Sequence, residues 1–301
     1  MGKTRRREVV PLIHAFAAPP RLGVNLLCDP GRCWIESHGS PRIAAMKRQF
    51  LAIAIAALLP GCGSGAGTKV ALEPVRIAAA SDLQAVMPKI LERFKAETGV
   101  EVVATFGASG QLSQQIKQGA PFDVFLAANR KFVTDLAEAK VLDPATVQDY
   151  AVGSLALIVR EEVPATVKTL ADLKNPAIKK IALANPDTAP YGAAAKQSLE
   201  RSGLWDDLEP KRVQAETVRQ ALQFVDSGNA EAGLVGAAIA KIRGVRIIPV
   251  DDSLHDPLTQ SLGVIAQSKR KIDAMAFARF VLSGGGRDLL RDAGFRVDFA
   301  K

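Results

Sequence analysis

Two serines stand where an apolar run gives way to a helical pattern. Ser81 follows the apolar run at residues 77–80, and Ser109 follows soon after the predicted strand at residues 100–106. A serine at such a junction often caps the helix, because its hydroxyl accepts a backbone N–H and stabilises the helix by about 1 kcal/mol. Alternatively, the hydroxyl and the free N–H groups at the helix start bind an anion. Two such serines in the same half of the chain favour the anion site.

Two further junctions have the same character. The chain enters a helix near Tyr191, in "ANPDTAPYGAAAKQSL", and again near Val218, in "QAETVRQAL". Four converging helix starts, each equivalent to roughly +0.5 charge, would supply about two positive charges without any Lys or Arg. Such a total suits a dianion. A site made only of donors also excludes protonated anions, since their O–H would meet no acceptor.

The elements that must position these residues alternate between strands and helices. Short apolar runs rich in Val and Ile predict strands at residues 75–80, 100–106, 123–128, 154–159, 180–184, 232–235, 245–250 and 262–266. Apolar residues at helical spacing predict helices at residues 83–98, 131–142, 193–203, 217–228 and 271–284, with another starting at Ser109. This alternation predicts an α/β fold of mostly parallel sheets flanked by helices. Ligands of such sheets bind at the carboxyl ends of the strands, where the junctions lie.

The composition argues against catalysis and against nucleic acid as a partner. Of the net charge of +8, residues 1–62 hold +6, from nine Lys and Arg against three acidic residues, so the rest is nearly neutral. Beyond Cys62 there is no cysteine, and His255 is the single histidine, in a polar loop where we expect it to be solvated. With His255 as the one candidate base, we do not expect a Ser-His triad, and one histidine without cysteine does not make a normal zinc site. We therefore expect no enzyme activity and no cofactor.

The N-terminal part has the pattern of an export signal. Met46 begins a short basic segment, an apolar stretch follows at residues 50–60, and "LPGC" ends at Cys62. This ending resembles the lipobox of bacterial lipoprotein signal peptides, which implies lipidation of Cys62. Ordinary signal cleavage is the alternative, and both place the protein in the periplasm or on the outer face of the cytoplasmic membrane. Residues 1–45 are interpreted as a disordered, non-native extension upstream of a translation start at Met46, and residues 63–72 as a flexible linker.

Four stretches together carry a family resemblance: "AAASDL", "FGASGQLSQQIKQGAPFDVFLAA", "NPDTAPYGAAAKQSL" and "ETVRQALQFVDSGNAEAGLV". From Val75 to Phe295 the chain is similar to the periplasmic molybdate-binding proteins of ABC transporters. The resemblance implies the type II periplasmic-binding-protein fold, in which two crossing strands join two α/β lobes. It implies a first lobe of residues 73–154 plus 253–301 and a second lobe of residues 155–252.

The same resemblance implies the ligand contacts. Ser81 and Ser109 would bind the oxyanion through hydroxyl and backbone groups, and Tyr191 and Val218 through their backbone N–H groups, so that molybdenum is held only as its oxyanion. Many members of the family have a tyrosine after the strand that here reads "AGLV", whereas this chain has Gly236. Asp82 is a further polar candidate, although its carboxylate would repel a dianion unless only its N–H is used.

The expected function is capture of molybdate, and of tungstate, by a monomer that delivers the anion to a membrane permease. The substitution of Gly236 keeps open another oxyanion such as sulfate or thiosulfate. An exported enzyme on the same fold is the third alternative, and the scarcity of His and Cys in the body disfavours it.

Overall fold

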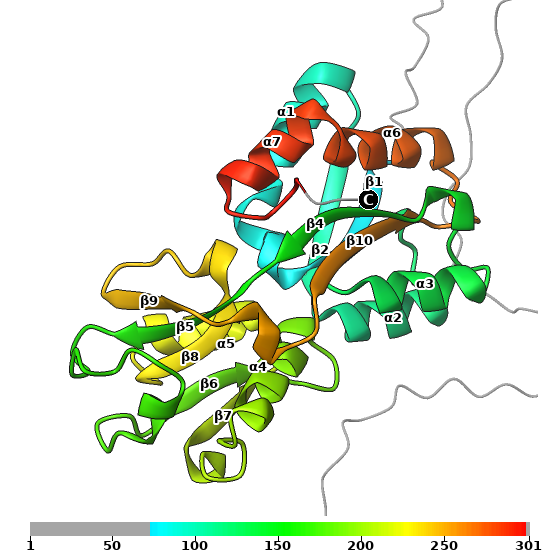
Figure 1. Cartoon of the computed structure of the whole chain (residues 1–301). Coiled ribbons are helices and arrows are strands. Elements are labelled where there is room, and N and C mark those ends of the chain that lie inside the picture. The colour runs from blue at the N-terminus through cyan, green and yellow to red at the C-terminus, as the bar shows by residue number, and fades with distance from the viewer. Residues whose placement is uncertain (1–72, 299–301) are drawn as a thin grey trace, which may run out of the picture. The chain divides into compact units, whose positions relative to one another are not determined.

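The computed structural model describes residues 73–298, which form two five-stranded sheets with flanking helices (Figure 1). The predicted upstream extension, signal peptide, lipidation site and linker lie outside the described residues. Among the residues that are described, no helix is long and apolar enough to cross a membrane. We call each sheet with its helices a lobe.

The first lobe is built on a sheet of strand order β2-β1-β3-β10-β4. Its strands are β1 (Val75–Ala80), β2 (Val102–Gly107), β3 (Val124–Ala127), β4 (Gln148–Gly153) and β10 (Leu258–Val264). Its helices are α1 (Met87–Thr98), α2 (Ser109–Lys117), α3 (Arg130–Glu138), α6 (Lys271–Leu282) and α7 (Gly284–Asp292). Strands β1, β2 and β3 are parallel, while β10 is antiparallel to both of its neighbours.

Helices cover both faces of this sheet, so its central strands are apolar on both sides. Ile77 of β1 packs with α1 and α6, where Phe94 and Phe277 meet edge to face with ring centroids 5.2 Å apart. The neighbouring Ala78 belongs to the opposite face, with Leu112 of α2. The apolar sequence of β1 from Ile77 to Ala80 follows from this double burial.

The second lobe has the strand order β7-β6-β8-β5-β9. Its strands are β5 (Leu155–Arg160), β6 (Ile181–Ala184), β7 (Arg212–Ala215), β8 (Ala232–Gly236) and β9 (Val245–Pro249), and its helices are α4 (Pro190–Arg201) and α5 (Val218–Asp226). Strand β6 is parallel to β7 and β8, whereas β5 is antiparallel to β8 and β9.

The chain passes between the two sheets twice (Figure 1). It leaves the first sheet at the end of β4 and enters the second at Leu155, with one residue between. It returns from β9 to β10 through the short 3-10 helix η6 (Asp252–Leu254). The two crossing segments adjoin β4 and β10, which are neighbouring strands of the first sheet.

The prediction of two mostly parallel sheets is confirmed, and each sheet is mixed because one strand is reversed, β10 in the first and β5 in the second. Strands β4 and β7, at sheet edges, were not predicted, since their sequences "QDYAVG" and "RVQA" have little apolar patterning. Helix α7 was not predicted either, because it begins with three glycines. A side chain at Gly286 would collide with the backbone of α6 at Phe280 and Val281, so close helix packing accounts for this glycine.

Candidate functional site

Residues from both lobes enclose a small cavity at the carboxyl ends of β1, β2 and β3. Its cavity volume is about 10 Å³, which is room for roughly one water molecule and far below the roughly 300–1,000 Å³ of sites for drug-sized ligands. The wall consists of Ala80, Ser81, Asp82, Gly107, Ala108, Ser109 and Ala128 from the first lobe and Ala189, Pro190, Tyr191 and Val218 from the second. The structure thus brings together the four residues predicted to bind the ligand, and Asp82 with them. Within this wall no side chain is Lys or Arg.

Each predicted residue lies at the start of a helical element. Ser109 and Val218 are the first residues of α2 and α5, and Tyr191 is the second residue of α4. Ser81 differs, because it begins a five-residue 3-10 helix, η1 (Ser81–Ala85), that precedes α1. The first N–H groups of a helix have no partner within it, so these starts present backbone donors to the cavity wall.

Neither serine caps its helix. The N-cap positions are Ala80 and Ala108, and no side chain accepts a capping hydrogen bond at either helix start. The capping interpretation of Ser81 and Ser109 is therefore wrong. By contrast, Thr217 does cap α5, since its side chain accepts from the N–H of Gln220.

The hydroxyl of Ser109 has one role within the protein and one free hydrogen. Its Oγ accepts the N–H of Ala128 at 3.0 Å, and Ser109 is 1% exposed. Because the oxygen already accepts from the end of β3, its hydrogen remains available to donate into the cavity. Ser81 is also buried.

A polar network joins the lobes behind the serines. The Gln260 side chain, on β10, donates from Nε2 to Asp82 Oδ2 at 2.6 Å and to the Tyr191 hydroxyl at 3.1 Å. Burial raises the pKa of Asp82 to about 6, against the opposing effects of Gln260 and Tyr191. Burial also raises the pKa of Tyr191 well above its usual value, so its hydroxyl stays neutral. The site therefore contains one buried carboxyl group and neutral hydroxyls.

Gly236 lies against the ring of Tyr191, outside the set of residues that line the cavity. A Cβ at position 236 would come within 3.0 Å of two ring carbons of Tyr191. At Gly153, at the end of β4, a Cβ would collide with the Tyr191 hydroxyl. The two glycines thus make room for the side chain of Tyr191.

The sequence predicted only a backbone contribution from Tyr191. The role of its hydroxyl was missed because no local pattern links it to Gln260.

The lobes touch directly across the cavity. The N–H of Gly110, the second residue of α2, donates to the carbonyl of Thr188 in the second lobe at 2.8 Å. Nearby, Gln111 donates from Nε2 to Glu216 Oε2, also at 2.8 Å. These two contacts hold α2 against the loop before α4 and the start of α5, so the structure is a closed form.

His255 is buried, at 4% exposed, and the expectation of a solvated loop histidine is wrong. Its Nδ1 lies 2.8 Å from the carbonyl oxygen of Asp256, and its loop is covered by α4, where Arg201 pairs with Asp256. The loop is polar in sequence but packed in the fold, which explains the error. No nucleophile is hydrogen-bonded to His255 in the described part of the chain.

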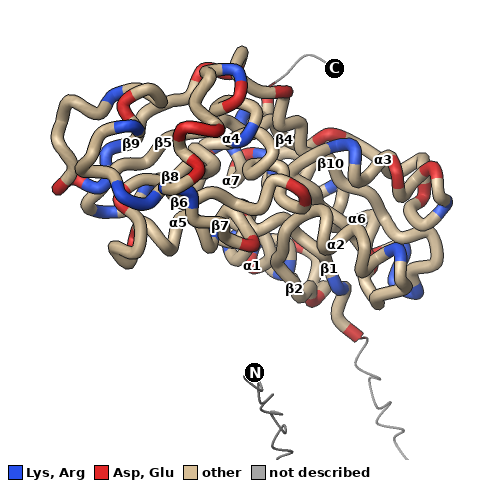
Figure 2. The backbone as a smooth tube through the Cα atoms, turned by 90° about the horizontal axis from the view of Figure 1, so that it is seen from below, with Lys and Arg blue, Asp and Glu red and all other residues tan. Residues whose placement is uncertain are grey.

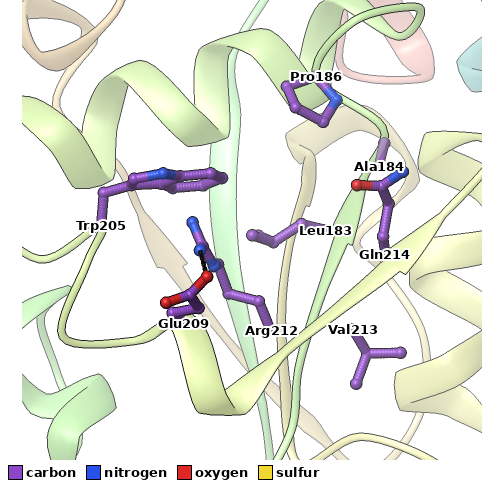
Figure 3. A pocket seen from close by; sticks show the side chains of 8 residues that line it. All are labelled: Leu183, Ala184, Pro186, Trp205, Glu209, Arg212, Val213 and Gln214. Carbon is purple, nitrogen blue, oxygen red and sulfur yellow. Dashed lines mark ion pairs between the residues drawn. The ribbon is translucent and has the colours of Figure 1, made fainter.

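The second lobe has a larger hollow of its own (Figure 3). Unlike the cavity between the lobes, it has charged side chains in its wall. The guanidinium of Arg212 stacks 3.5 Å from the centroid of the Trp205 ring, and Glu209 lies beside it. All the residues that line it belong to one lobe, so closure would not enclose a ligand there. Elsewhere on the described chain, basic and acidic segments are interspersed (Figure 2).

Comparisons with known proteins agree with this geometry. The sequence profile of the family described as "Bacterial extracellular solute-binding protein" matches residues 75–296. The molybdate-binding protein ModA of Azotobacter vinelandii is 33% identical over 250 residues, which cover 81% of this chain and 96% of that protein. The ModA of Escherichia coli K12 is 31% identical over 232 residues, or 74% of this chain and 89% of that protein.

A solved structure shares the architecture. The structure of the periplasmic molybdate-binding protein of Azotobacter vinelandii superposes with a TM-score of 0.70 at 27% identity, covering 75% of this chain and all of that one. The match of the family profile spans nearly all of the described residues, including both sheets and the cavity wall. The chain therefore belongs to the family of bacterial extracellular solute-binding proteins.

Proposed function

We propose that this protein captures molybdate, and also tungstate, in the cavity between its lobes and delivers the anion to the permease of an ABC transporter. The observation that carries the proposal is the convergence of Ser81, Ser109, Tyr191 and Val218 on one small cavity without a cation in its wall. The two ModA relatives at 31–33% identity are named for molybdate binding, which supports the choice of anion.

The donors act together only when the lobes are closed. Ser81 and Ser109 belong to the first lobe, and the N–H groups of Tyr191 and Val218 belong to the second. An anion that contacts both sets stabilises the closed form over the open one, because only that form offers every donor. The α-helix starts at α2, α4 and α5 add roughly +0.5 charge each toward the anion. In this role the protein binds and releases its ligand without changing it.

We also propose that the protein acts as a monomer and that it is exported. We propose that residues 46–62 direct export and that Cys62 carries the lipid, which would hold the protein at the outer face of the cytoplasmic membrane. Mass spectrometry of the protein purified from its native membrane tests this. A mature chain that begins with an unmodified residue other than Cys62 would contradict the lipid anchor.

Isothermal titration calorimetry with the purified full-length chain tests the choice of anion. Molybdate and tungstate should bind with a stoichiometry of one, while sulfate, thiosulfate and phosphate bind far more weakly. Equal or tighter binding of sulfate or thiosulfate would instead favour the second candidate that Gly236 left open. The absence of binding by any of these oxyanions would refute the proposal.

A further inference from the structure

Asp82 is the feature of the cavity that a donor-only site does not explain. It is 1% exposed and lies in the cavity wall beside Ser81. Its Oδ2 accepts from Gln260 at 2.6 Å, but its Oδ1 is buried with no hydrogen-bond partner in the described structure. Tyr191 and the backbone N–H groups of Asp82 and Leu83 also favour the carboxylate, but burial outweighs them and raises the pKa of Asp82. A buried carboxylate is costly without a cation or several donors. An oxyanion beside it would make ionisation costlier still.

Protonation of Asp82 removes both difficulties. A neutral carboxylic acid has an O–H donor, and an unpartnered oxygen is the atom that can carry it. The oxygens of a bound oxyanion are acceptors, so the new donor would have a partner at once. An acid here would therefore match the other donors of the wall, the hydroxyls of Ser81 and Ser109.

We propose that Asp82 holds the bound oxyanion as a neutral acid, with its Oδ1 donating a hydrogen bond to a ligand oxygen, so that capture takes up one proton. This inference rests on the proposed function and identifies a specificity determinant within the same site. Closing the lobes around the anion would then require a proton, and raising the pH would weaken binding.

The surroundings of Asp82 leave it as the group that titrates. The hydroxyls of Tyr191, on α4, and Tyr150, on β4, face it, and burial raises the pKa of both tyrosines well above the usual range. Gln260, on β10, is neutral. Burial raises the pKa of Asp82 itself to about 6 before any anion is present, and a dianion would raise it further.

The charged residues on the other elements packed against η1 leave Asp82 unpaired within the described part of the chain. Arg76, on β1, pairs with Glu73 at 3.1 Å, and Lys89, on α1, is exposed. Arg219 and Asp226, on α5, are not among the groups that shift the pKa of Asp82. Beyond these elements, the guanidinium of Arg296 pairs with Asp252 at 2.8 Å.

Calorimetry at pH 6.5, 7.5 and 8.5, in two buffers of different ionisation heat, tests the proposal with the full-length chain and molybdate. One proton taken up per anion corresponds to a fall in affinity of about tenfold per pH unit. Asp82→Asn should bind without proton uptake and with an affinity independent of pH. His255→Gln is the matched control, since it removes the single histidine of the described residues, which lies outside the cavity wall, and it should keep the wild-type dependence.

The outcomes separate this inference from the proposed function. Binding of molybdate by the wild type that is independent of pH and takes up no proton would overturn the inference alone, and so would a pH dependence that survives in Asp82→Asn. Tight binding of phosphate that strengthens as pH rises would mean that ionised Asp82 accepts a proton from the ligand, which also overturns it. No molybdate binding at any pH would refute the proposed function and the inference with it.

Discussion

Gly110 gives the sharpest test of lobe closure, because its main contact crosses between the lobes. A Cβ built at this position would lie 2.9 Å from the carbonyl oxygen of Thr188 and 3.1 Å from its Cα. Both are backbone atoms of the second lobe and cannot turn aside. A third contact, 3.3 Å from the ring of Phe132, lies within the first lobe and yields more easily. The substitution Gly110→Ala therefore strains the closed form specifically.

The expected cost follows from overpacking, which destabilises by about 1–3 kcal/mol, and here it falls on the closed form. At 1.4 kcal/mol per factor of ten, molybdate should bind about 5- to 150-fold more weakly. The unliganded protein should not lose stability, since Ala favours a helix over Gly by up to about 1 kcal/mol. Calorimetry gives the affinity, and thermal unfolding without ligand gives the stability.

A matched variant separates the contact from the change of residue type. Gly284 also lies at a helix start, and nothing lies within 4 Å of a Cβ built there. Gly284→Ala should leave the molybdate affinity unchanged. If Gly110→Ala binds as tightly as the wild type, binding does not bring α2 against Thr188, and the mechanism of closure is wrong.

Three further perturbations have distinct expected results. Ser109→Ala should weaken molybdate binding by about 1–3 kcal/mol in calorimetry, because a ligand oxygen loses its donor. It should also lower the stability of the folded protein, since the N–H of Ala128 loses its partner. Unchanged affinity would remove Ser109 from the site. Asp82→Asn should stabilise the unliganded protein at pH 8 by at most about 3 kcal/mol, the equivalent of a rise of about two units in pKa. Since the folded pKa of Asp82 is raised to about 6, the gain should vanish as pH falls from 6 toward 4 in urea unfolding, and a gain that grows toward low pH would contradict the assignment. Arg212→Ala should cost about 0.5–1 kcal/mol of stability, because the stacking on Trp205 is lost. The molybdate affinity should not change. A large loss of affinity would place the ligand in the hollow of Figure 3.

Local patterns predicted the parts of the fold whose burial is uniform. Apart from the exposed Arg76, strand β1 is buried on both faces, and its residues 77–80 read as an unbroken apolar run. The edge strands β4 and β7 alternate irregularly between buried and exposed residues, so they carry no clear period. The sequence alone also gives no direction for a strand, which is why the antiparallel β5 and β10 were not anticipated.

The site was predictable only where it depends on helix starts. The positions of Ser81 and Ser109 follow from the change of period at each junction, and the fold brings them to one cavity. The link between Asp82 and Gln260 spans 178 positions, and no local pattern connects them. The role of the Tyr191 side chain likewise depends on two glycines, Gly153 and Gly236, that become its neighbours only in the folded chain.

A crystal structure of the complex with molybdate tests the central claim most directly. The account predicts the anion between the lobes, with its oxygens at hydrogen-bond distance, about 2.7–3.2 Å, from the hydroxyls of Ser81 and Ser109 and from the N–H groups of Tyr191 and Val218. No Lys or Arg should contact it. An anion bound by a guanidinium or an ammonium group, or held by one lobe alone, would contradict the account.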